Sequence, residues 1–152
     1  MIRFAAIVLV SFVVMEFVSY LAHRYVYHKL LWVFHRSHHS PRTGPFEAND
    51  VFPVFFATVA LIIMFAALRE PVWPDLLAVS IGVSLYGMVY FFVHDLYVHR
   101  RIKRLGLRIP FLIQVKKAHA LHHRYGGEPY GLLFFTNPDR VRREVIDEDR
   151  DV

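Results

Sequence analysis

Three long apolar runs dominate the chain. They cover residues 4–22, 51–68 and 76–93, and the third extends back to residue 73. The first run contains a single charge, Glu16, and the other two contain none. A helix rises about 1.5 Å per residue, so each run spans roughly 27–30 Å, the thickness of a bilayer core. The pattern predicts an all-α integral membrane bundle of three to four transmembrane helices.

Positive charges assign the two sides of the membrane. Sixteen of the eighteen Lys and Arg residues lie in 23–50 and 94–152, which three spans place on the same side. The positive-inside rule makes that side cytoplasmic. We therefore expect an integral protein of a bacterial or archaeal cytoplasmic membrane with its site on the cytoplasmic side. The net charge of +5 is then mainly a topology signal, and no nucleic-acid partner is expected because no basic stripe carries a binding motif.

Composition supports a bilayer as the solvent for much of the chain. Apolar residues make up 55% of the 152 residues and aromatic residues 16%. The first run follows Arg3 as a signal peptide would. However, it is long, lacks a small-x-small exit and leads directly into histidines, so we expect it to be retained. Because the chain has no cysteine, disulfides, thiolate metal sites and a cysteine nucleophile are excluded.

All ten histidines fall in four clusters, two with H-x4-H spacing and two with H-x2-H-H spacing. In chain order they are His23 and His28; His35, His38 and His39; His94 and His99; and His119, His122 and His123. Each half of the chain has an apolar run, then an H-x4-H, then an H-x2-H-H. This order predicts a two-fold internal repeat, with the run at 51–68 returning the chain to the same membrane face.

Helix geometry favours ligation by these clusters. Positions i, i+3 and i+4 fall within an arc of roughly 100°. We therefore expect His35, His38 and His39 to point to one locus, and the second triplet to do the same. The H-x4-H histidines lie about 140° apart on an ideal helix. That spacing suits a helix end, where either the last turn distorts or the two imidazoles bind different metals.

Metal binding explains ten histidines better than the alternatives. A pH sensor needs one or a few, and packing ten imidazoles into one pocket would cost desolvation energy. Imidazole suits Zn, Cu, Fe and Ni, but one tetrahedral zinc uses about four ligands. The clusters therefore predict a cytoplasmic di-metal cap with five or six ligands per ion. A nitrogen-only site beside an apolar volume fits iron that activates O₂ toward an inert C–H bond.

Residues beyond the histidines carry a family resemblance. They are "HRSHHSPRTGPFEANDVF" at 35–52, "YGMVYFFVHDLYVH" at 86–99, "AHALHH" at 118–123 and "YGLLFF" at 130–135. Over about residues 1–136 they resemble the membrane-bound fatty acid hydroxylase superfamily of non-haem di-iron oxygenases, and within it the bacterial β-carotene hydroxylases (carotenoid 3-hydroxylases). The acidic "FEAND" resembles this branch rather than the fatty acyl or sterol branches.

The resemblance implies two non-haem iron ions that use O₂ and two electrons. It implies a carotenoid substrate, hydroxylated at C3 of the β-ionone ring, so that β-carotene becomes β-cryptoxanthin and then zeaxanthin. It also implies that all ten histidines bind or lie close to the metals. The loop between the third and fourth clusters differs from the family pattern, which leaves open whether the preferred ring is plain, keto-bearing or otherwise modified.

Several acids lie near the histidines in sequence. Asp95 follows His94, and Glu47 and Asp50 follow the second cluster. A carboxylate that accepts an imidazole N–H orients the ring and raises its basicity as a ligand. We expect this role for the three acids, and a similar one for Asn49; helix capping or surface charge is the alternative.

Glu16 and the aromatic residues of 86–92 are the other candidates inside the spans. An intramembrane acid points to function, and we expect Glu16 to pair with Ser80 or Ser84; a packing role is the alternative. The aromatic side chains either line a channel for a polyene or face the core and lipid.

The shorter segments complete the predicted organisation. Residues 110–124 predict an amphipathic interfacial helix, and residues 129–136, too short to span, predict a cap or re-entrant piece under the site. Whether this region spans, re-enters or lies on the membrane stays open. Residues 137–152 alternate in charge and predict a solvated tail, so that the membrane domain covers 1–136.

Other functions and partners remain to be weighed. A fatty acyl or sterol hydroxylase or a carotenoid ketolase would share the metal site. A histidine-rich metal transporter would place histidines along the spans, and a b-type haem carrier would leave most of the ten unused. No nucleotide-binding glycine motif is present, so we expect a separate ferredoxin or similar electron donor with its reductase. Its expected docking residues are Arg100, Arg101, Lys103 and Arg104. The sequence is compatible with an oligomer.

Overall fold

The described residues fold entirely into helices. The structure is a computed structural model that describes residues 1–69, 74–101 and 106–133, and no strand occurs in these ranges. The elements are α1 (Ile2–Leu21), η1 (Ala22–Leu30), α2 (Trp32–His35), η2 (Ala48–Asp50), α3 (Val51–Arg69), α4 (Pro74–Tyr90), η3 (Phe91–Val98) and α5 (Pro110–Tyr125). Of these, η1 and η3 are π-helices and η2 is a 3₁₀ helix.

Three continuous helices are long and apolar enough to cross a membrane. They are Ile2–Leu30, Ala48–Arg69 and Pro74–Val98, and they contain the three apolar runs. Their outer faces leave large apolar side chains uncovered, as at Leu9 and Ile62, each 63% exposed. A bilayer removes such surface from water. The prediction of an all-α bundle is confirmed, with three spans among the described residues.

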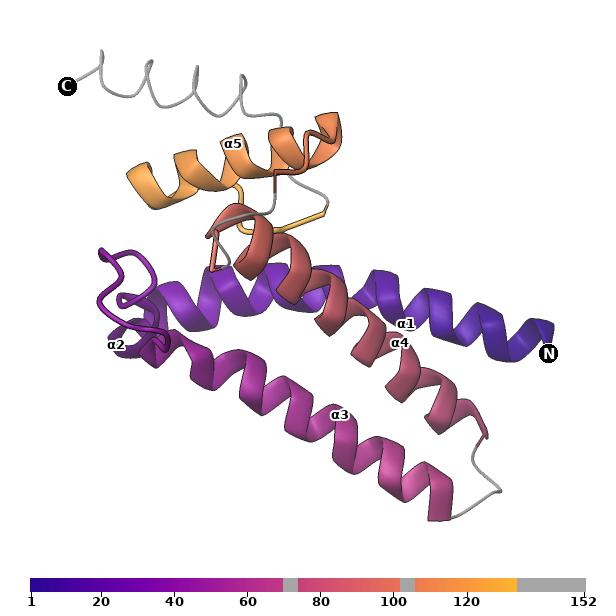
Figure 1. Cartoon of the computed structure of the whole chain (residues 1–152). Helices are drawn as coiled ribbons and strands as arrows, with labels where there is room; N and C mark the ends of the chain where they lie inside the picture. The colour runs from indigo at the N-terminus through magenta and orange to yellow at the C-terminus, as the bar shows by residue number, and fades with distance from the viewer. Residues whose placement is uncertain (70–73, 102–105, 134–152) are drawn as a thin grey trace.

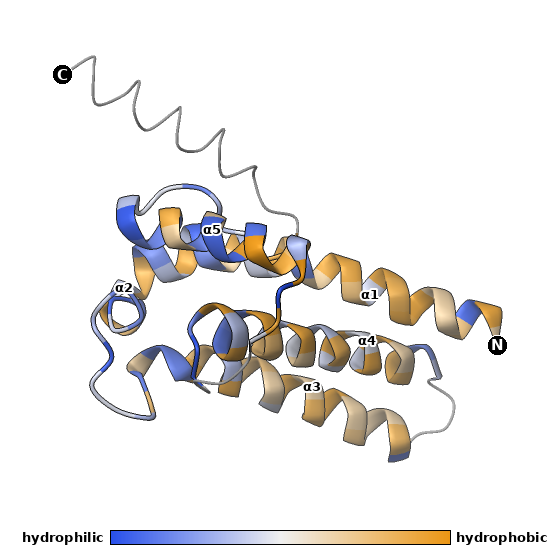
Figure 2. Cartoon of the chain, turned by 45° about the horizontal axis from the view of Figure 1, so that its top comes forward, coloured by the Kyte–Doolittle hydropathy of each residue, from blue (hydrophilic) through white to orange (hydrophobic). Residues whose placement is uncertain are grey.

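The spans run side by side, with α4 between α1 and α3 (Figure 1). At one end of the bundle, Arg3 of α1 forms an ion pair with Asp75 of α4. The histidines lie toward the other end, where α2 and α5 are placed. Figure 2 shows the same division, with apolar residues along the spans and hydrophilic residues gathered on α5 and after α2.

Gly82 sets the close approach of α4 to α1. A Cβ atom at this position would lie 2.5 Å from the carbonyl oxygen of Val8 and 2.7 Å from the Cβ of Ser11. Ala78 and Ser80, on the same helix, are fully buried. Small residues let membrane helices pack backbone against backbone, where dispersion contacts replace the missing hydrophobic drive.

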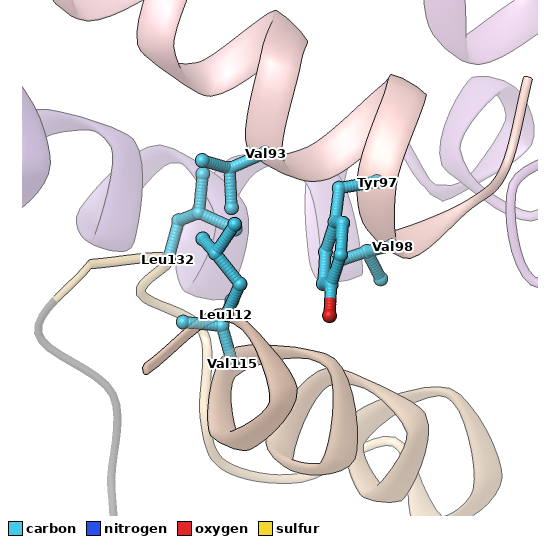
Figure 3. Close-up of a cluster of buried hydrophobic side chains, with 6 residues drawn as sticks. All are labelled: Val93, Tyr97, Val98, Leu112, Val115 and Leu132. Atoms are coloured by element: carbon cyan, nitrogen blue, oxygen red, sulfur yellow. The ribbon is translucent and has the colours of Figure 1, made fainter. Parts of the chain in front are cut away.

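An apolar cluster holds α5 against η3 (Figure 3). Its members are Val93, Tyr97, Val98, Leu112, Val115 and Leu132. Helix α5 begins with Pro110 in its first turn, where a missing N–H costs nothing. It ends at Gly126, whose φ of 76° is left-handed and whose N–H donates to the carbonyl of His122 at 2.8 Å.

The predicted helix at 110–124 is thus present. The predicted tail at 137–152 lies outside the described residues, as does the end of the predicted cap at 129–136.

Candidate metal centre

The two H-x4-H motifs lie on π-helical turns. The N–H of Leu31 donates to the carbonyl of Val26 at 2.8 Å, and that of His99 donates to the carbonyl of His94 at 2.9 Å. These bonds join residues five apart, so residues five apart return to the same helix face. The ring centroids of His23 and His28 are 4.9 Å apart. Of the two alternatives predicted for this spacing, the structure therefore shows the distorted turn.

The ten histidines form two clusters of five. Cluster A consists of His23, His28, His35, His39 and His122, and one ring nitrogen of each lies within 4.8 Å of the others. The same holds for His38, His99, His119 and His123. His94 joins this second group, because its Nε2 is 3.1 Å from the Nε2 of His38. These five are cluster B.

The prediction that each H-x2-H-H triplet points to one locus is wrong. The first and last histidine of each triplet enter the same cluster, and the middle one enters the other. On a helix, i and i+4 lie about 40° apart, whereas i+3 lies about 60° to the other side of i. Thus His38 leaves the first triplet for cluster B, and His122 leaves the second for cluster A. The spacing already contained this signal.

The Nε2 atoms face inward in both clusters. In cluster A the Nε2 atoms of His23 and His35 are 3.0 Å apart, and in cluster B those of His99 and His119 are 2.9 Å apart. The Nδ1 atoms of several rings face outward to oxygen acceptors, which fixes their proton on Nδ1. Inward-facing nitrogens without a proton repel one another at such distances. A cation between them removes that repulsion, so both clusters fit a bound metal ion.

The nitrogen spacing also bears on the coordination geometry. Six inward Nε2 pairs are separated by 2.8–3.2 Å. With metal–nitrogen bonds of about 2.1 Å, angles of 90° at the metal give about 3.0 Å between ligands, and tetrahedral angles give about 3.4 Å. The shorter spacing and five ligands favour a metal with more than four coordination positions over tetrahedral zinc.

Burial lowers the pKa of several of the imidazoles, which keeps those rings neutral. Loss of hydration lowers the pKa of His35 and of His39 to about 3, with smaller contributions from neighbouring imidazoles. The same cause lowers the pKa of His99 to about 2 and that of His122 to about 4. A neutral imidazole has the lone pair that a metal needs, so both clusters are ready to bind cations at neutral pH.

The "FEAND" segment at 46–50 connects both clusters to their surroundings. Glu47 Oε2 lies 3.2 Å from Nδ1 of His38 in cluster B, and Asn49 Oδ1 lies 2.7 Å from Nδ1 of His35 in cluster A. The Glu47 and Asp50 side chains form a capping box on η2, which fixes this short helix. The hydrogen bond with His38 holds the pKa of Glu47 below its usual value.

Asp50 contacts no histidine among the described residues, unlike the prediction. It binds Arg101 instead. The Nε of Arg101 also lies 2.9 Å from Asp95 Oδ1, and the other oxygen of Asp95 lies 3.6 Å from Nδ1 of His94. Arg101, expected as a docking residue, is therefore held inside an ion-pair network. Sequence reasoning missed this role because Asp50 lies 51 positions from Arg101.

Glu16 is buried, and three of its contacts are with groups that were not predicted. The O–H of Tyr86 donates to its Oε2 at 2.8 Å, and the backbone N–H groups of Leu132 and Leu133 donate to its Oε1, each at 2.7 Å. Ser80 instead donates to the carbonyl of Leu77. Glu16 therefore attaches the chain after α5 to α1.

The attached segment forms part of cluster A's surroundings. The carbonyl of Tyr130 accepts from Nδ1 of His23 at 2.9 Å, and that of Gly127 accepts from Nδ1 of His122 at 2.5 Å. Glu128 binds Arg24 at 3.0 Å. The described part of the predicted cap thus lies against the site. Every residue has a backbone carbonyl, so the sequence could not show which carbonyls accept hydrogen bonds from the histidines.

Comparisons with known proteins agree with this arrangement. A family model described as fatty acid hydroxylase matches residues 8–143. "Beta-carotene hydroxylase 2, chloroplastic" of Capsicum annuum is 41% identical over 78% of this chain and 40% of its own length. "Beta-carotene 3-hydroxylase 2, chloroplastic" of Arabidopsis thaliana is 41% identical over 84% of this chain and 43% of its own. "Beta-carotene hydroxylase" of Pseudescherichia vulneris is 40% identical over 87% and 77%.

The chain spans about two fifths of the length of the chloroplast relatives. No solved structure matches it.

Proposed function

The chain belongs to the fatty acid hydroxylase family, and from this premise we propose that it hydroxylates carotenoid β-ionone rings at C3. β-Carotene would become β-cryptoxanthin and then zeaxanthin. The observation that carries the proposal is the convergence of ten imidazoles into two five-membered clusters at the end of three membrane-capable helices. The names of the relatives support the substrate class.

Two iron ions, one in each cluster, are the proposed cofactors. Iron bound there would supply the activation of O₂: with two electrons and two protons, one oxygen atom would enter a C–H bond and the other would leave as water. The donor set supports this assignment. Neutral imidazole nitrogens suit iron, and Nε2–Nε2 distances of 2.8–3.2 Å are shorter than the ligand–ligand distances expected around tetrahedral zinc. All ten histidines are the proposed ligands.

The surrounding residues have proposed positioning roles. Asn49, Glu47 and the Tyr130 carbonyl accept imidazole N–H groups and fix the rings, so each Nε2 lone pair points inward. Asp95 accepts no hydrogen bond from His94, and its proposed role is to place a carboxylate 3.6 Å from the Nδ1 of that ring. Asp50 acts through Arg101 rather than on a histidine.

Aromatic side chains limit where the substrate ring lies. Tyr90 stacks on His94 with ring centroids 4.8 Å apart, and Tyr27 stacks on Phe52 at 3.8 Å beside cluster A. Among the aromatic residues of 86–92, Tyr86 donates a hydrogen bond to Glu16, and Phe91 is half exposed. We assign the ring contact to Tyr27 and Tyr90, whose rings lie beside His35 and His94, at centroid distances of 5.7 Å and 4.8 Å.

Electrons come from a ferredoxin or similar donor with its reductase. Arg100 is exposed and suits an acidic partner, and Lys103 and Arg104 lie outside the described residues. The cytoplasmic side of a bacterial or archaeal membrane is the proposed location of the site, since most Lys and Arg residues lie at the histidine end. With purified protein, NAD(P)H alone should give no product, and added ferredoxin and reductase should restore it.

The decisive experiment expresses the chain in a bacterial host that accumulates β-carotene. Extracted carotenoids should contain β-cryptoxanthin and zeaxanthin. The variant His119→Ala should leave β-carotene unconverted, because the His119 Nε2 lies within 2.9 Å of two other ligand atoms of cluster B. Unchanged β-carotene in the wild-type culture would refute the proposal. Keto products would instead identify a ketolase, and hydroxylated fatty acids or sterols another branch of the family.

A further inference from the structure

The clusters differ in the groups that surround them. In cluster A, each outward Nδ1 with a partner among the described residues donates to a neutral oxygen. The pairs are His23 with the Tyr130 carbonyl, His35 with the Asn49 side chain and His122 with the Gly127 carbonyl. None of these acceptors carries a charge.

Cluster B has carboxylates in the equivalent positions. Glu47 Oε2 lies 3.2 Å from Nδ1 of His38, and Asp95 Oδ2 lies 3.6 Å from Nδ1 of His94. That His94 nitrogen is buried and has no hydrogen bond within the described part of the chain, so the carboxylate acts on it through its charge. Both acids are almost fully covered, with side chains 12% and 9% exposed. Solvent screening of their charge is therefore weak.

Nearby arginines hold these acids without covering the atoms that face the imidazoles. Arg101 binds Asp95 through Oδ1, whereas Oδ2 faces His94. Arg42 lies 3.6 Å from Glu47 Oε1, whereas Oε2 faces His38. The guanidinium groups fix the carboxylates, and each keeps one oxygen toward cluster B.

An imidazole binds a metal ion more strongly through Nε2 when its Nδ1 proton faces a carboxylate than when it faces a carbonyl. The reason is that the carboxylate draws the Nδ1 proton away from the ring. It also places a negative charge close to the bound cation. We infer that the two metal sites are inequivalent, and that cluster B, supported by Glu47 and Asp95, binds the first divalent ion more tightly than cluster A. The inference rests on the proposed function only in that both clusters bind metal.

Metal titration tests this directly. Metal-free protein in detergent, without O₂ or carotenoid, is titrated with Co²⁺ and followed by calorimetry and visible absorption. Two ions should bind in two resolved steps. Glu47→Gln should weaken the tighter step by about 10–100-fold, the range for removal of a group that orients a metal ligand. The weaker step should keep its affinity.

Two further variants sharpen the result. Asp75→Asn removes the same charge at the far end of the bundle, where Asp75 pairs with Arg3, and should change neither step. Asn49→Asp places a carboxylate beside His35 and should tighten the weaker step, so that the two affinities approach each other. This gain in affinity tests the inference even if Glu47→Gln does not fold.

Two equal binding steps in the wild type would overturn the inference, as would an equal loss at both steps in Glu47→Gln. The same preparation, loaded with iron, is assayed for hydroxylated carotenoids with reductant. Equal steps with product formed overturn the inference alone. Unequal steps without hydroxylated product overturn the proposed function alone.

Discussion

Replacing Glu16 tests whether an acid inside a span holds part of the metal site in place. Three groups of the described residues donate hydrogen bonds to its carboxylate, namely the Tyr86 O–H and the backbone N–H groups of residues 132 and 133. Glu16→Leu has similar bulk and removes every acceptor. Glu16→Gln keeps one oxygen for the two backbone N–H groups, and its amide can donate to the Tyr86 oxygen.

The expected cost follows from these three contacts. Each buried donor left without a partner costs about 1–3 kcal/mol. Three such donors at about 1 kcal/mol each, the lower end of that range, give a loss of about 3 kcal/mol in the free energy of unfolding for Glu16→Leu. We use the lower end because the change also removes the desolvation cost of a buried carboxylate. At about 2–4 °C per kcal/mol for a chain of this size, the Tm should fall by about 6–12 °C. Glu16→Gln exchanges charged for neutral hydrogen bonds and should lose only about 1 kcal/mol.

The assay measures thermal unfolding in detergent together with bound metal per chain. In Glu16→Leu the segment carrying Tyr130 is released, so His23 loses its acceptor and occupancy of cluster A should fall while cluster B stays filled. A Tm for Glu16→Leu within about 3 °C of the wild type, which corresponds to about 1 kcal/mol, would refute the reasoning. A large fall in Tm with both metals retained would refute the link between Glu16 and cluster A.

Three other predictions concern packing, the ion-pair network and the metals. Gly82→Ala should lower the Tm by several degrees, because its Cβ would lie 2.5 Å from a carbonyl oxygen of α1, whereas Gly87→Ala, with no atom within 4 Å, should not. Arg101→Gln should weaken metal binding at cluster B about tenfold by freeing Asp95, while Arg101→Lys should retain part of it, as metal titration would show. Chelation should abolish hydroxylation, Fe²⁺ should restore it and Zn²⁺ should not; recovery with Zn²⁺ would contradict the iron assignment.

The spans were predictable because membrane insertion depends on the summed hydrophobicity of a segment, which needs no knowledge of partners. The runs at 51–68 and 76–93 match α3 and α4 with η3 closely. Pairs of neighbouring imidazoles were predictable for a similar reason, since local spacing alone brings two of them together, but the division of each triplet between two clusters was not predicted. Contacts between distant segments were not predictable. Glu16 was assigned to Ser80 or Ser84 because both lie on a neighbouring span, whereas its partners on 132–133 depend on how α5 folds back.

The π-helical turns show a different limit. A sequence does not state whether a helix widens by one residue, so H-x4-H on an ideal helix gave two alternatives. The i→i+5 bonds at His94–His99 and Val26–Leu31 settle them. The H-x4-H spacing fits this widened turn, because a π-turn brings residues five apart to the same face of the helix. The H-x4-H motif can therefore be interpreted as a pair of ligands on a π-turn.

The exchange of the middle histidines changes what the internal repeat means. Each half supplies four histidines to its own cluster and one to the other, through His38 and His122. A metal ion in cluster A would therefore connect α5 with η1, and a metal ion in cluster B would connect the turn after α2 with η3. Among the described helices, α5 packs chiefly on η3, so a metal ion in cluster A would add a further link from α5 to η1 and α2. Loading of either cluster should consequently stabilise both halves, because metal-binding free energy adds to folding free energy wherever the ligands come from separate segments.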